Sequence, residues 1–217
     1  MEDLSKTACE RYAAVCRPPL PSPAYENIEI LLASNSPRRR ELLGLIVPQF
    51  TIAPPKVVDE CYPDDLVPEE VPAYLSRLKA SAYKGGLAEN QLLITADTVV
   101  IIDGRILGKP KGYAEAVAML GMLSGRSHTV VTGVTLTALG GRKNDTFAVS
   151  TEVRFAHLDE AEIEAYVSAF RPFDKAGAYG IQEWIGAAAI EGMVGSFYNV
   201  MGLPLHALYL HLRSFYS

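Results

Sequence analysis

The sequence predicts an α/β protein that is built around a mixed sheet with flanking helices. Segments with the pattern of strands alternate along the chain with segments of helical pattern, which is typical of the α/β and α+β classes. Two long strand-like segments, 128–139 and 146–157, are joined by a short turn and should pair antiparallel. The chain shows no internal repeat, so a repeat architecture is not expected.

Composition and charge place the chain among ordinary globular proteins. Of its 217 residues, 49% are hydrophobic and 21% are charged, and the formal net charge is -5. An acidic excess argues against a general nucleic-acid binder, whose surface is usually basic.

The three cysteines, Cys9, Cys16 and Cys61, form no CxxC spacing, so we expect neither a disulfide framework nor a structural zinc site. No apolar run is long enough to cross a membrane, and the N-terminus lacks a secretory signal. A cytoplasmic protein without membrane contact is therefore predicted.

Residues 1–27 are predicted to form an N-terminal extension, with a short helix followed by a proline-rich linker. The functional domain is expected to comprise residues 28–217. It begins with an apolar segment, IEILLA at 28–33, which has the length and composition of a buried strand. A helix should follow through RRRELLGLI, with Ser36 as its N-cap and Pro37 in its first position.

The rest of the domain alternates between further helices and strands. The pair Asp103-Gly104 is typical of a tight hairpin turn, and the pattern from Asp159 to Glu162 is a capping box broadened to Asp, which marks a helix start. In chain order we predict loop or irregular strand at 48–70, a helix at 71–87, a strand at 92–102 that leads into the hairpin, a helix at 113–123, strands at 128–139 and 146–157, a helix ending near Phe170, a glycine-rich stretch at 175–202, and a last helix from Pro204.

The first of these helices begins with a cluster of basic residues. Arg38, Arg39 and Arg40 occupy its first turn, where the positive end of the helix dipole disfavours cations. A bound polyanion would explain this placement, because free backbone N–H groups and arginine side chains would then face a phosphate chain. Ser34, at the end of the preceding strand, adds a hydroxyl donor. The alternative is a solvated basic patch that pairs with surface acids.

Asp97 interrupts the strand predicted at 92–102, whose other residues are apolar or neutral. A buried carboxylate needs a partner or a metal, so Asp97 suits a ligand of a divalent cation or the base that activates water. Lys109 follows twelve residues later, across the predicted hairpin, so it and Asp97 could share a cleft. Glu60, in the acidic loop VVDECYPDD, is a candidate second carboxylate for a metal, and the alternative is that it is a surface acid. The alternative for Asp97 is that it begins a turn after a shorter strand.

A third candidate segment, DKAGAYGIQ at residues 174–182, is rich in small residues that let the backbone approach a ligand. Lys175 supplies a charge suited to phosphate, and Gln182 offers a donor and an acceptor suited to the edge of a base.

The motifs of several other enzyme classes are absent from the sequence. The chain has no P-loop, no GxGxxG after a strand, no Gly-x-Ser-x-Gly and no HxxxH pair, which disfavours kinases, dinucleotide dehydrogenases and serine hydrolases.

Taken in order, these segments resemble the Maf family of nucleoside triphosphate pyrophosphatases. The matching stretches are LLASNSPRRRELL, ADTVV with GRILGKP, LSGRSHTVVTGV, DKAGAYGIQ and GSFYNVMGLPL, which together span about residues 28–212. The resemblance implies a strongly curved mixed sheet with two lobes around a cleft, similar to the inosine triphosphate pyrophosphatase architecture. It also implies hydrolysis of a nucleoside triphosphate to the monophosphate and pyrophosphate, a divalent cation (Mg²⁺ or Mn²⁺) as cofactor, and a homodimer.

The same resemblance implies roles for individual residues. Asp97 matches the catalytic aspartate, Lys79 matches a lysine of the cleft, and Lys109 and Lys175 match lysines that face phosphate; Lys79 and Lys109 are counted with Asp97 as expected catalytic residues. Glu60 matches an acidic position by spacing, so that Asp97 and Glu60 are the expected metal ligands. The expected substrate-binding residues are Ser34, Arg38, Arg39, Thr98, Lys175 and Gln182.

Arg39, Thr98 and Gln182 together resemble the subgroup that prefers dTTP and UTP, including modified uridine nucleotides. Two alternatives stay open at this point. One is a pyrophosphatase of the same family for another base, such as a methylated guanine nucleotide. The other is a non-enzymatic nucleotide or nucleic-acid binder that affects cell division, against which the acidic net charge argues.

Overall fold

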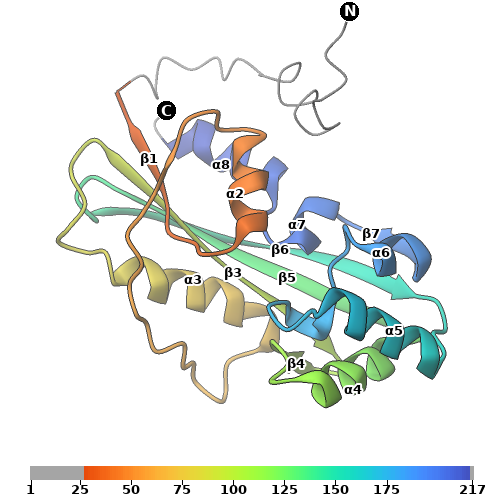
Figure 1. Cartoon of the computed structure of the whole chain (residues 1–217). Helices are drawn as coiled ribbons and strands as arrows, with labels where there is room; N and C mark the ends of the chain where they lie inside the picture. The colour runs from red at the N-terminus through yellow and green to blue at the C-terminus, as the bar shows by residue number, and fades with distance from the viewer. Residues whose placement is uncertain (1–26, 216–217) are drawn as a thin grey trace, which may run out of the picture.

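The chain folds around one seven-stranded mixed sheet (Figure 1). The structure, a computed structural model, describes residues 27–215. Six strands follow one another in the order β2-β1-β3-β5-β6-β7, and β4 pairs with β3. β1 runs parallel to β2 and β3 and the other pairs are antiparallel, which confirms the predicted α/β class with a mixed sheet. The strands are β1 (Glu29–Leu32), β2 (Thr51–Ile52), β3 (Gln91–Ile102), β4 (Arg105–Leu107), β5 (Ser127–Ala138), β6 (Lys143–Phe155) and β7 (Ile190–Val194).

Helices cover both faces of this sheet, as Figure 1 shows. The helix α3 packs on one face, whereas α2 and α8 cover one end of the opposite face and α4 and α5 cover its other end. The helical elements are α2 (Pro37–Gly44), η2 (Pro68–Glu70), α3 (Val71–Ser81), α4 (Tyr113–Leu123), α5 (Glu160–Phe170), η3 (Ala176–Ala178), α6 (Trp184–Ala188), α7 (Phe197–Met201) and α8 (Leu205–Phe215).

Two hydrophobic cores lie on the face of the sheet that α2, α8, α4 and α5 cover. Side chains of β3 alternate between the faces, so Leu92 and Ile94 pack with α2 and α8, while Val100 and Ile102 pack with α4 and α5. Between the two cores the facing position is Thr98, whose hydroxyl lies 2.9 Å from that of Thr132 on β5. A polar row therefore separates the two cores, and it is the place where a cleft between two lobes is expected.

The opposite face of the sheet is covered by α3, which lies unusually close to β5. At Gly133 an added Cβ atom would lie 2.3 Å from the backbone nitrogen of Ala73 and 2.3 Å from the backbone carbon of Pro72. A glycine is needed there because no side chain fits between the strand and the first turn of the helix. Gly133 pairs with Asp97 across β3 and β5, so this close approach brings α3 next to Asp97.

One edge of β3 is partly uncovered. β5 pairs along one side of β3, and on the other side β1 pairs with residues 91–94 and β4 with residues 100–102. Among the described residues no strand covers residues 95–99 on that side, and we call this stretch the open edge of β3. Side chains from both faces of the sheet can therefore reach the same space there, although they alternate along the strand.

Most predicted elements are confirmed, with local differences. The helix predicted at 71–87 ends at Ser81, and turns follow it up to Gly85, whose φ of 82° suits glycine. The glycine-rich stretch at 175–202 is not only loop, because it contains η3, α6, β7 and α7. Asp103 and Gly104 both have positive φ, as the predicted hairpin turn between β3 and β4 requires. The extension predicted at 1–27 falls almost entirely outside the described residues.

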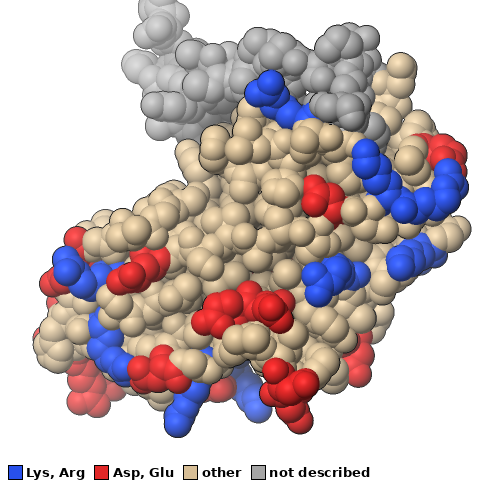
Figure 2. Space-filling model, turned by 180° about the vertical axis from the view of Figure 1, so that it is seen from behind, with Lys and Arg blue, Asp and Glu red and all other residues tan. Residues whose placement is uncertain are grey.

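The surface of the described part carries charges of both signs. Figure 2 shows acidic and basic side chains interspersed on the face turned away from the viewer of Figure 1, and no continuous basic surface among the residues described there. Within residues 27–215, no helix combines the length and the apolar character that crossing a membrane requires.

Candidate active site

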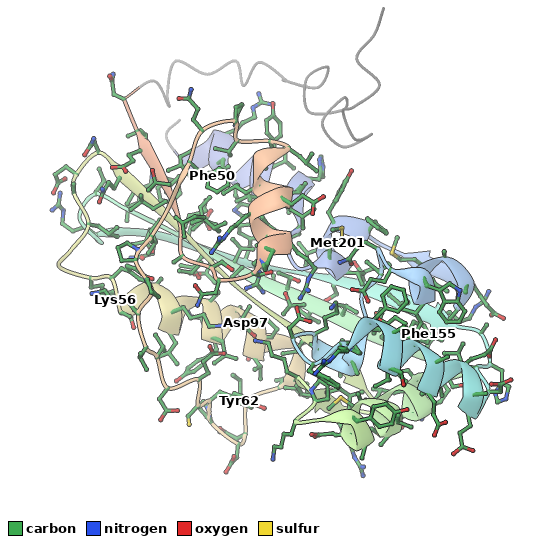
Figure 3. The ribbon with its side chains drawn as sticks, in the orientation of Figure 1. Phe50, Lys56, Tyr62, Asp97, Phe155 and Met201 are labelled. Carbon is green, nitrogen blue, oxygen red and sulfur yellow. The ribbon has the colours of Figure 1, made fainter. Side chains whose placement is uncertain are left out.

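Two formally charged residues are buried in the part of the chain that the structure describes, and both line one cavity. Asp97 and Lys175 are each 8% exposed. The cavity has a volume of about 410 Å³ and lies at the open edge of β3. Burying a charge is costly unless it is paired, so two such groups in one cavity indicate a built polar site. Figure 3 shows Asp97 near the centre of the molecule, between the ribbons of α2 and α3.

The cavity brings together nine of the ten residues predicted from the sequence. Ser34, the tenth, lines an adjacent cavity of about 490 Å³ that shares several wall residues with the first. The nine residues are Arg38, Arg39, Glu60, Lys79, Asp97, Thr98, Lys109, Lys175 and Gln182.

Lys79 links the two predicted metal-directed carboxylates. It lies one helical turn after Leu75, on the side of α3 that faces the sheet, so its ammonium group meets Asp97. Its Nζ atom is 2.5 Å from Oδ1 of Asp97 and 3.1 Å from Oε2 of Glu60. The second carboxylate oxygen of Asp97, Oδ2, has no hydrogen-bond partner among the described residues, and the residue lines the cavity. Asp97 is thus fixed through one oxygen and left open at the other.

The start of α2 has the geometry predicted from the sequence. Ser36 is the N-cap, and its Oγ accepts a hydrogen bond from the backbone N–H of Arg39, while Pro37 stands in the first turn. No acidic residue occupies this turn. Oγ of Ser34 accepts a hydrogen bond from the backbone N–H of Ser36 at 3.2 Å and so stabilises the approach to the helix. The helix start therefore points its positive end at the two cavities.

Arg39 was predicted to bind phosphate, but its guanidinium group is hydrogen-bonded to the protein through all three nitrogens. Its Nε donates to the carbonyl oxygen of Gly202 at 2.8 Å, its Nη1 to that of Ala96 at 2.9 Å, and its Nη2 to Oγ1 of Thr98 at 3.0 Å. Burial lowers the pKa of Arg39, and the negative charge of Asp97 opposes this effect. Arg39 thereby fastens the start of α2 to the open edge of β3.

Arg38 reaches a different partner, the carboxylate of Asp174. Its Nη1 is 2.7 Å from Oδ2 of Asp174, and Nζ of Lys175 is 2.8 Å from Oδ1 of the same residue. Burial would raise the pKa of Asp174, but the hydrogen bonds from Lys175 and Arg38 outweigh it and lower that pKa to about 2. Asp174 therefore stays ionised and holds two cations side by side at the cavity wall.

Lys109 and Gln182 face the cavity without such ties. Both are exposed, and neither has a hydrogen bond or ion pair with any residue that the structure describes. Lys109 also lines the adjacent cavity, so it can reach a ligand that extends through both. Gln182 lines the same cavity as Thr98 and Gly202, and its amide can meet the edge of a ligand there.

Two carboxylates of the cavity are the candidate ligands for a divalent cation. Asp97 and Glu60 are linked through Lys79 and line the same cavity. No group of three or more His, Cys, Asp or Glu side chains among residues 27–215 could hold a metal by itself. Mg²⁺ commonly binds through one or two carboxylates plus phosphate oxygens of the substrate, and two carboxylates beside a phosphate-binding surface fit that pattern.

Several site residues were missed at the sequence level. Asp174 is the first residue of the candidate segment at 174–182 and Glu183 directly follows that segment, and the structure places both on Lys175. Tyr62 lines the cavity from the acidic loop that also carries Glu60, and Figure 3 shows it beside that loop. Asp174 directly precedes Lys175 in the chain, so an adjacent opposite charge was a visible signal, whereas the pairing of Glu183 depends on the fold of the loop.

Known proteins resemble this chain over most of its length. Residues 29–215 match the family model described as Maf-like protein. The dTTP/UTP pyrophosphatase of Porphyromonas gingivalis is 53% identical over 189 residues, which is 86% of this chain and 94% of that protein. The dTTP/UTP pyrophosphatase of Bacteroides fragilis is 50% identical over 188 residues, 87% of this chain and 96% of that protein.

Solved structures give a more distant likeness. The Ham1 protein of Staphylococcus aureus aligns with a TM-score of 0.42 and 18% identity, covering 59% of this chain and 72% of that chain. A nucleoside-triphosphatase, also named a dITP/XTP pyrophosphatase, from Mycobacterium abscessus aligns with a TM-score of 0.38 and 15% identity, over 60% and 76% of the two chains. The match to the family model over almost the whole described chain, together with relatives of this identity, shows that the chain belongs to the Maf-like protein family.

Proposed function

We propose that this chain is a metal-dependent nucleotide pyrophosphatase that hydrolyses dTTP and UTP to the monophosphate and pyrophosphate. The names of the relatives at about half identity support the substrates. The observation that carries the proposal is the cavity at the open edge of β3, where the buried carboxylate of Asp97 lies among the cations Arg38, Lys79, Lys109 and Lys175. A carboxylate to activate water and cations to hold a phosphate chain are the groups that this hydrolysis needs.

Asp97 serves as the base in the proposed mechanism. Lys79 holds its Oδ1, so Oδ2 accepts the proton of a water molecule as that water attacks the α-phosphorus. The bond between the α-phosphorus and the oxygen that bridges to the β-phosphate breaks, and pyrophosphate leaves with that oxygen. Asp97 later returns the proton to solvent.

The triphosphate lies along the start of α2 in this proposal. Arg38, Lys109 and Lys175 face it from the cavity wall, where their charges stabilise the leaving pyrophosphate. Asp97 and Glu60 would hold the Mg²⁺ or Mn²⁺ ion, which when bound neutralises phosphate charge and polarises phosphoryl oxygens. Arg39 orients the helix start rather than the phosphate, through its bonds to Ala96 and Gly202.

The pyrimidine preference is assigned to Thr98 and Gln182, which both line the cavity. Arg39 donates to Oγ1 of Thr98, and the hydroxyl of Thr98 lies 2.9 Å from that of Thr132, so its orientation is fixed. Gln182 is free to donate and accept at a base edge.

A cytoplasmic location and a homodimer, both expected from the sequence and the resemblance, stay predictions that fractionation and gel filtration can test.

A panel of triphosphates with detection of pyrophosphate tests the proposed function. Purified protein with Mg²⁺ or Mn²⁺ should release pyrophosphate from dTTP and UTP faster than from methylated guanine nucleotides, and a chelator should abolish the reaction until the ion is restored. Release of orthophosphate alone, or no release, would contradict it. The alternative of a nucleic-acid binder predicts duplex-DNA affinity that falls steeply between two salt concentrations. The formal net charge of -5 argues against this alternative.

A further inference from the structure

Lys175 has a second carboxylate partner that does not line the cavity. Its Nζ lies 3.1 Å from Oε1 of Glu183, in addition to its contact with Asp174. The two carboxylates differ in exposure, because the side chain of Asp174 is 57% exposed and that of Glu183 only 17%. Asp174 lines both cavities, whereas Glu183 lines neither. An incoming phosphate can therefore take the place of Asp174 on Lys175, but it does not reach Glu183.

Glu183 is itself held by a buried tyrosine. The hydroxyl of Tyr166 on α5 donates to Oε2 of Glu183, and it accepts the backbone N–H of Gly180 at 3.1 Å. Tyr166 is 1% exposed. Burial and the hydrogen bond to Glu183 raise the pKa of Tyr166, so its hydroxyl stays protonated and remains a donor.

Gly180 leaves room for the carboxylate of Glu183 in the loop that joins η3 to α6. A Cβ atom at Gly180 would lie 2.8 Å from Cδ of Glu183 and about as close to both carboxylate oxygens, so a residue with a side chain would displace Glu183. The backbone N–H of Glu183 donates to the carbonyl oxygen of Gly180 at 3.0 Å, which closes the turn around the carboxylate. The glycine lines the cavity, and Glu183 fills the space behind it.

From these contacts we infer that Glu183 and Tyr166 are positioning residues, which hold the ammonium group of Lys175 in the cavity wall so that it meets a phosphate group of the ligand. The inference rests on the proposed function in so far as the ligand carries a phosphate chain. Asp174 occupies Lys175 only until a phosphate arrives, and Glu183 keeps the ammonium group in place afterwards. A charge that is already fixed loses less side-chain freedom on binding than one that must be ordered.

The effect of Glu183 should therefore depend on Lys175, which a double-mutant cycle measures directly. The readout is the affinity for inorganic tripolyphosphate by titration calorimetry, in parallel with kcat/KM for dTTP. Glu183→Gln keeps the size of the side chain and removes its charge, and Lys175→Met removes the ammonium group. Glu164→Gln is the matched control, because it removes an exposed carboxylate without an ion pair from the helix that carries Tyr166.

We expect Glu183→Gln to weaken tripolyphosphate binding about tenfold to a hundredfold, the usual range for the loss of a hydrogen bond to a charged group. In the Lys175→Met background the same substitution should change affinity by no more than about twofold. Tyr166→Phe, which keeps the ring and removes the hydroxyl, should weaken binding in the same direction and show the same dependence on Lys175. If Glu183→Gln does not fold, the Tyr166→Phe cycle decides the question.

The outcomes separate this inference from the proposed function. Suppose that the wild type hydrolyses dTTP, and that either the effects of Glu183→Gln and Lys175→Met on tripolyphosphate affinity are additive or Glu183→Gln binds as tightly as Glu164→Gln. The positioning role is then overturned and the function stands. If the wild type releases no pyrophosphate from dTTP or UTP but binds tripolyphosphate with the expected dependence, the function fails and the positioning role stands. A wild type that does not bind tripolyphosphate overturns the inference.

Discussion

Nζ of Lys79 lies 2.5 Å from Oδ1 of Asp97, across the interface between α3 and β3. The contact joins a half-buried cation to a buried carboxylate in the middle of the strand, and it leaves Oδ2 of Asp97 open to the cavity. Because Asp97 would otherwise be an unpaired buried charge, this pair both stabilises the site and orients the proposed base.

Replacement of Lys79 by glutamine should reduce kcat/KM for dTTP by about a hundredfold, because a base displaced by even about 1 Å loses that much. Steady-state kinetics with pyrophosphate detection measures the change. Lys84→Gln, at an exposed position just after α3, is the control and should stay near the wild type. Kinetics of Lys79→Gln within about twofold of that control would show that the pair does not orient Asp97.

Gly133 controls how closely α3 approaches the strand beside Asp97. Gly133→Ala should lower the free energy of unfolding by about 1–3 kcal/mol, because the new methyl group overlaps the backbone of Pro72 and Ala73. It should also reduce kcat, since α3 carries Lys79. Denaturant unfolding and kinetics measure both effects. Gly121→Ala in α4, where an added Cβ meets nothing within 4 Å, should instead stabilise the protein by about 0.5–1 kcal/mol. Equal stability of the two variants would contradict the account.

Arg39 should not tolerate replacement by lysine, although the charge is kept. A single ammonium group cannot replace the three hydrogen bonds to Ala96, Thr98 and Gly202 that the planar guanidinium makes. We expect Arg39→Lys to lower kcat/KM by about tenfold or more, from the loss of at least one of those bonds. Arg40→Lys, exposed in the same helix, should have no effect. An active Arg39→Lys variant with unchanged preference for dTTP and UTP would show that these bonds do not shape the site.

The stability of the protein should fall between pH 7 and pH 5 because of His128. Burial lowers the pKa of His128 to about 4, below its unfolded value of about 6.5, so in this window the unfolded chain binds a proton that the folded protein does not. The stabilising contribution of neutral His128 is therefore fully present above the pKa of the unfolded chain, about 6.5. It is lost as the pH falls toward the pKa of the folded protein, and at pH 5 the free energy of unfolding is lower by about 2 kcal/mol.

His128→Gln removes this titration, so unfolding curves of the two proteins at both pH values isolate the effect. The difference in free energy between wild type and variant should shrink by that amount at pH 5. A difference that is the same at pH 5 and pH 7 would mean that His128 is not held neutral. The hydrogen bond between Nε2 of His128 and the hydroxyl of Tyr179, at 2.7 Å, places this group behind a residue of the cavity wall.

Local patterns allowed the sequence to predict most single elements. Ser36 and Pro37 specify the start of α2, and Asp159 with Glu162 forms the capping box that begins α5, because both signals act within one helical turn. Asp97 was identifiable as a site residue because a carboxylate in an otherwise apolar or neutral strand needs an explanation. The Lys79 assignment came from the family resemblance, since its contact with Asp97 depends on the packing of α3 against β3.

Contacts across the fold could not be predicted in this way. Nothing near Arg39 in the sequence shows that its guanidinium is turned toward Gly202 and Ala96, which lie 163 and 57 residues away. The open edge of β3 arises because β1 and β4 are both short, and strand pairing decides that. Likewise, the position of Glu183 behind Lys175 depends on the turn at Gly180 and on Tyr166 from another helix.

The central claim is that a water molecule activated by Asp97 attacks the α-phosphorus of the nucleotide. Hydrolysis of dTTP in H₂¹⁸O, followed by mass spectrometry of both products, tests it most directly. The account predicts that the label enters the phosphate of dTMP and that the pyrophosphate is unlabelled. It also predicts that Asp97→Asn still binds dTTP but turns over about a thousandfold more slowly. Label in pyrophosphate or in orthophosphate, or an Asp97→Asn variant as active as the wild type, would contradict it.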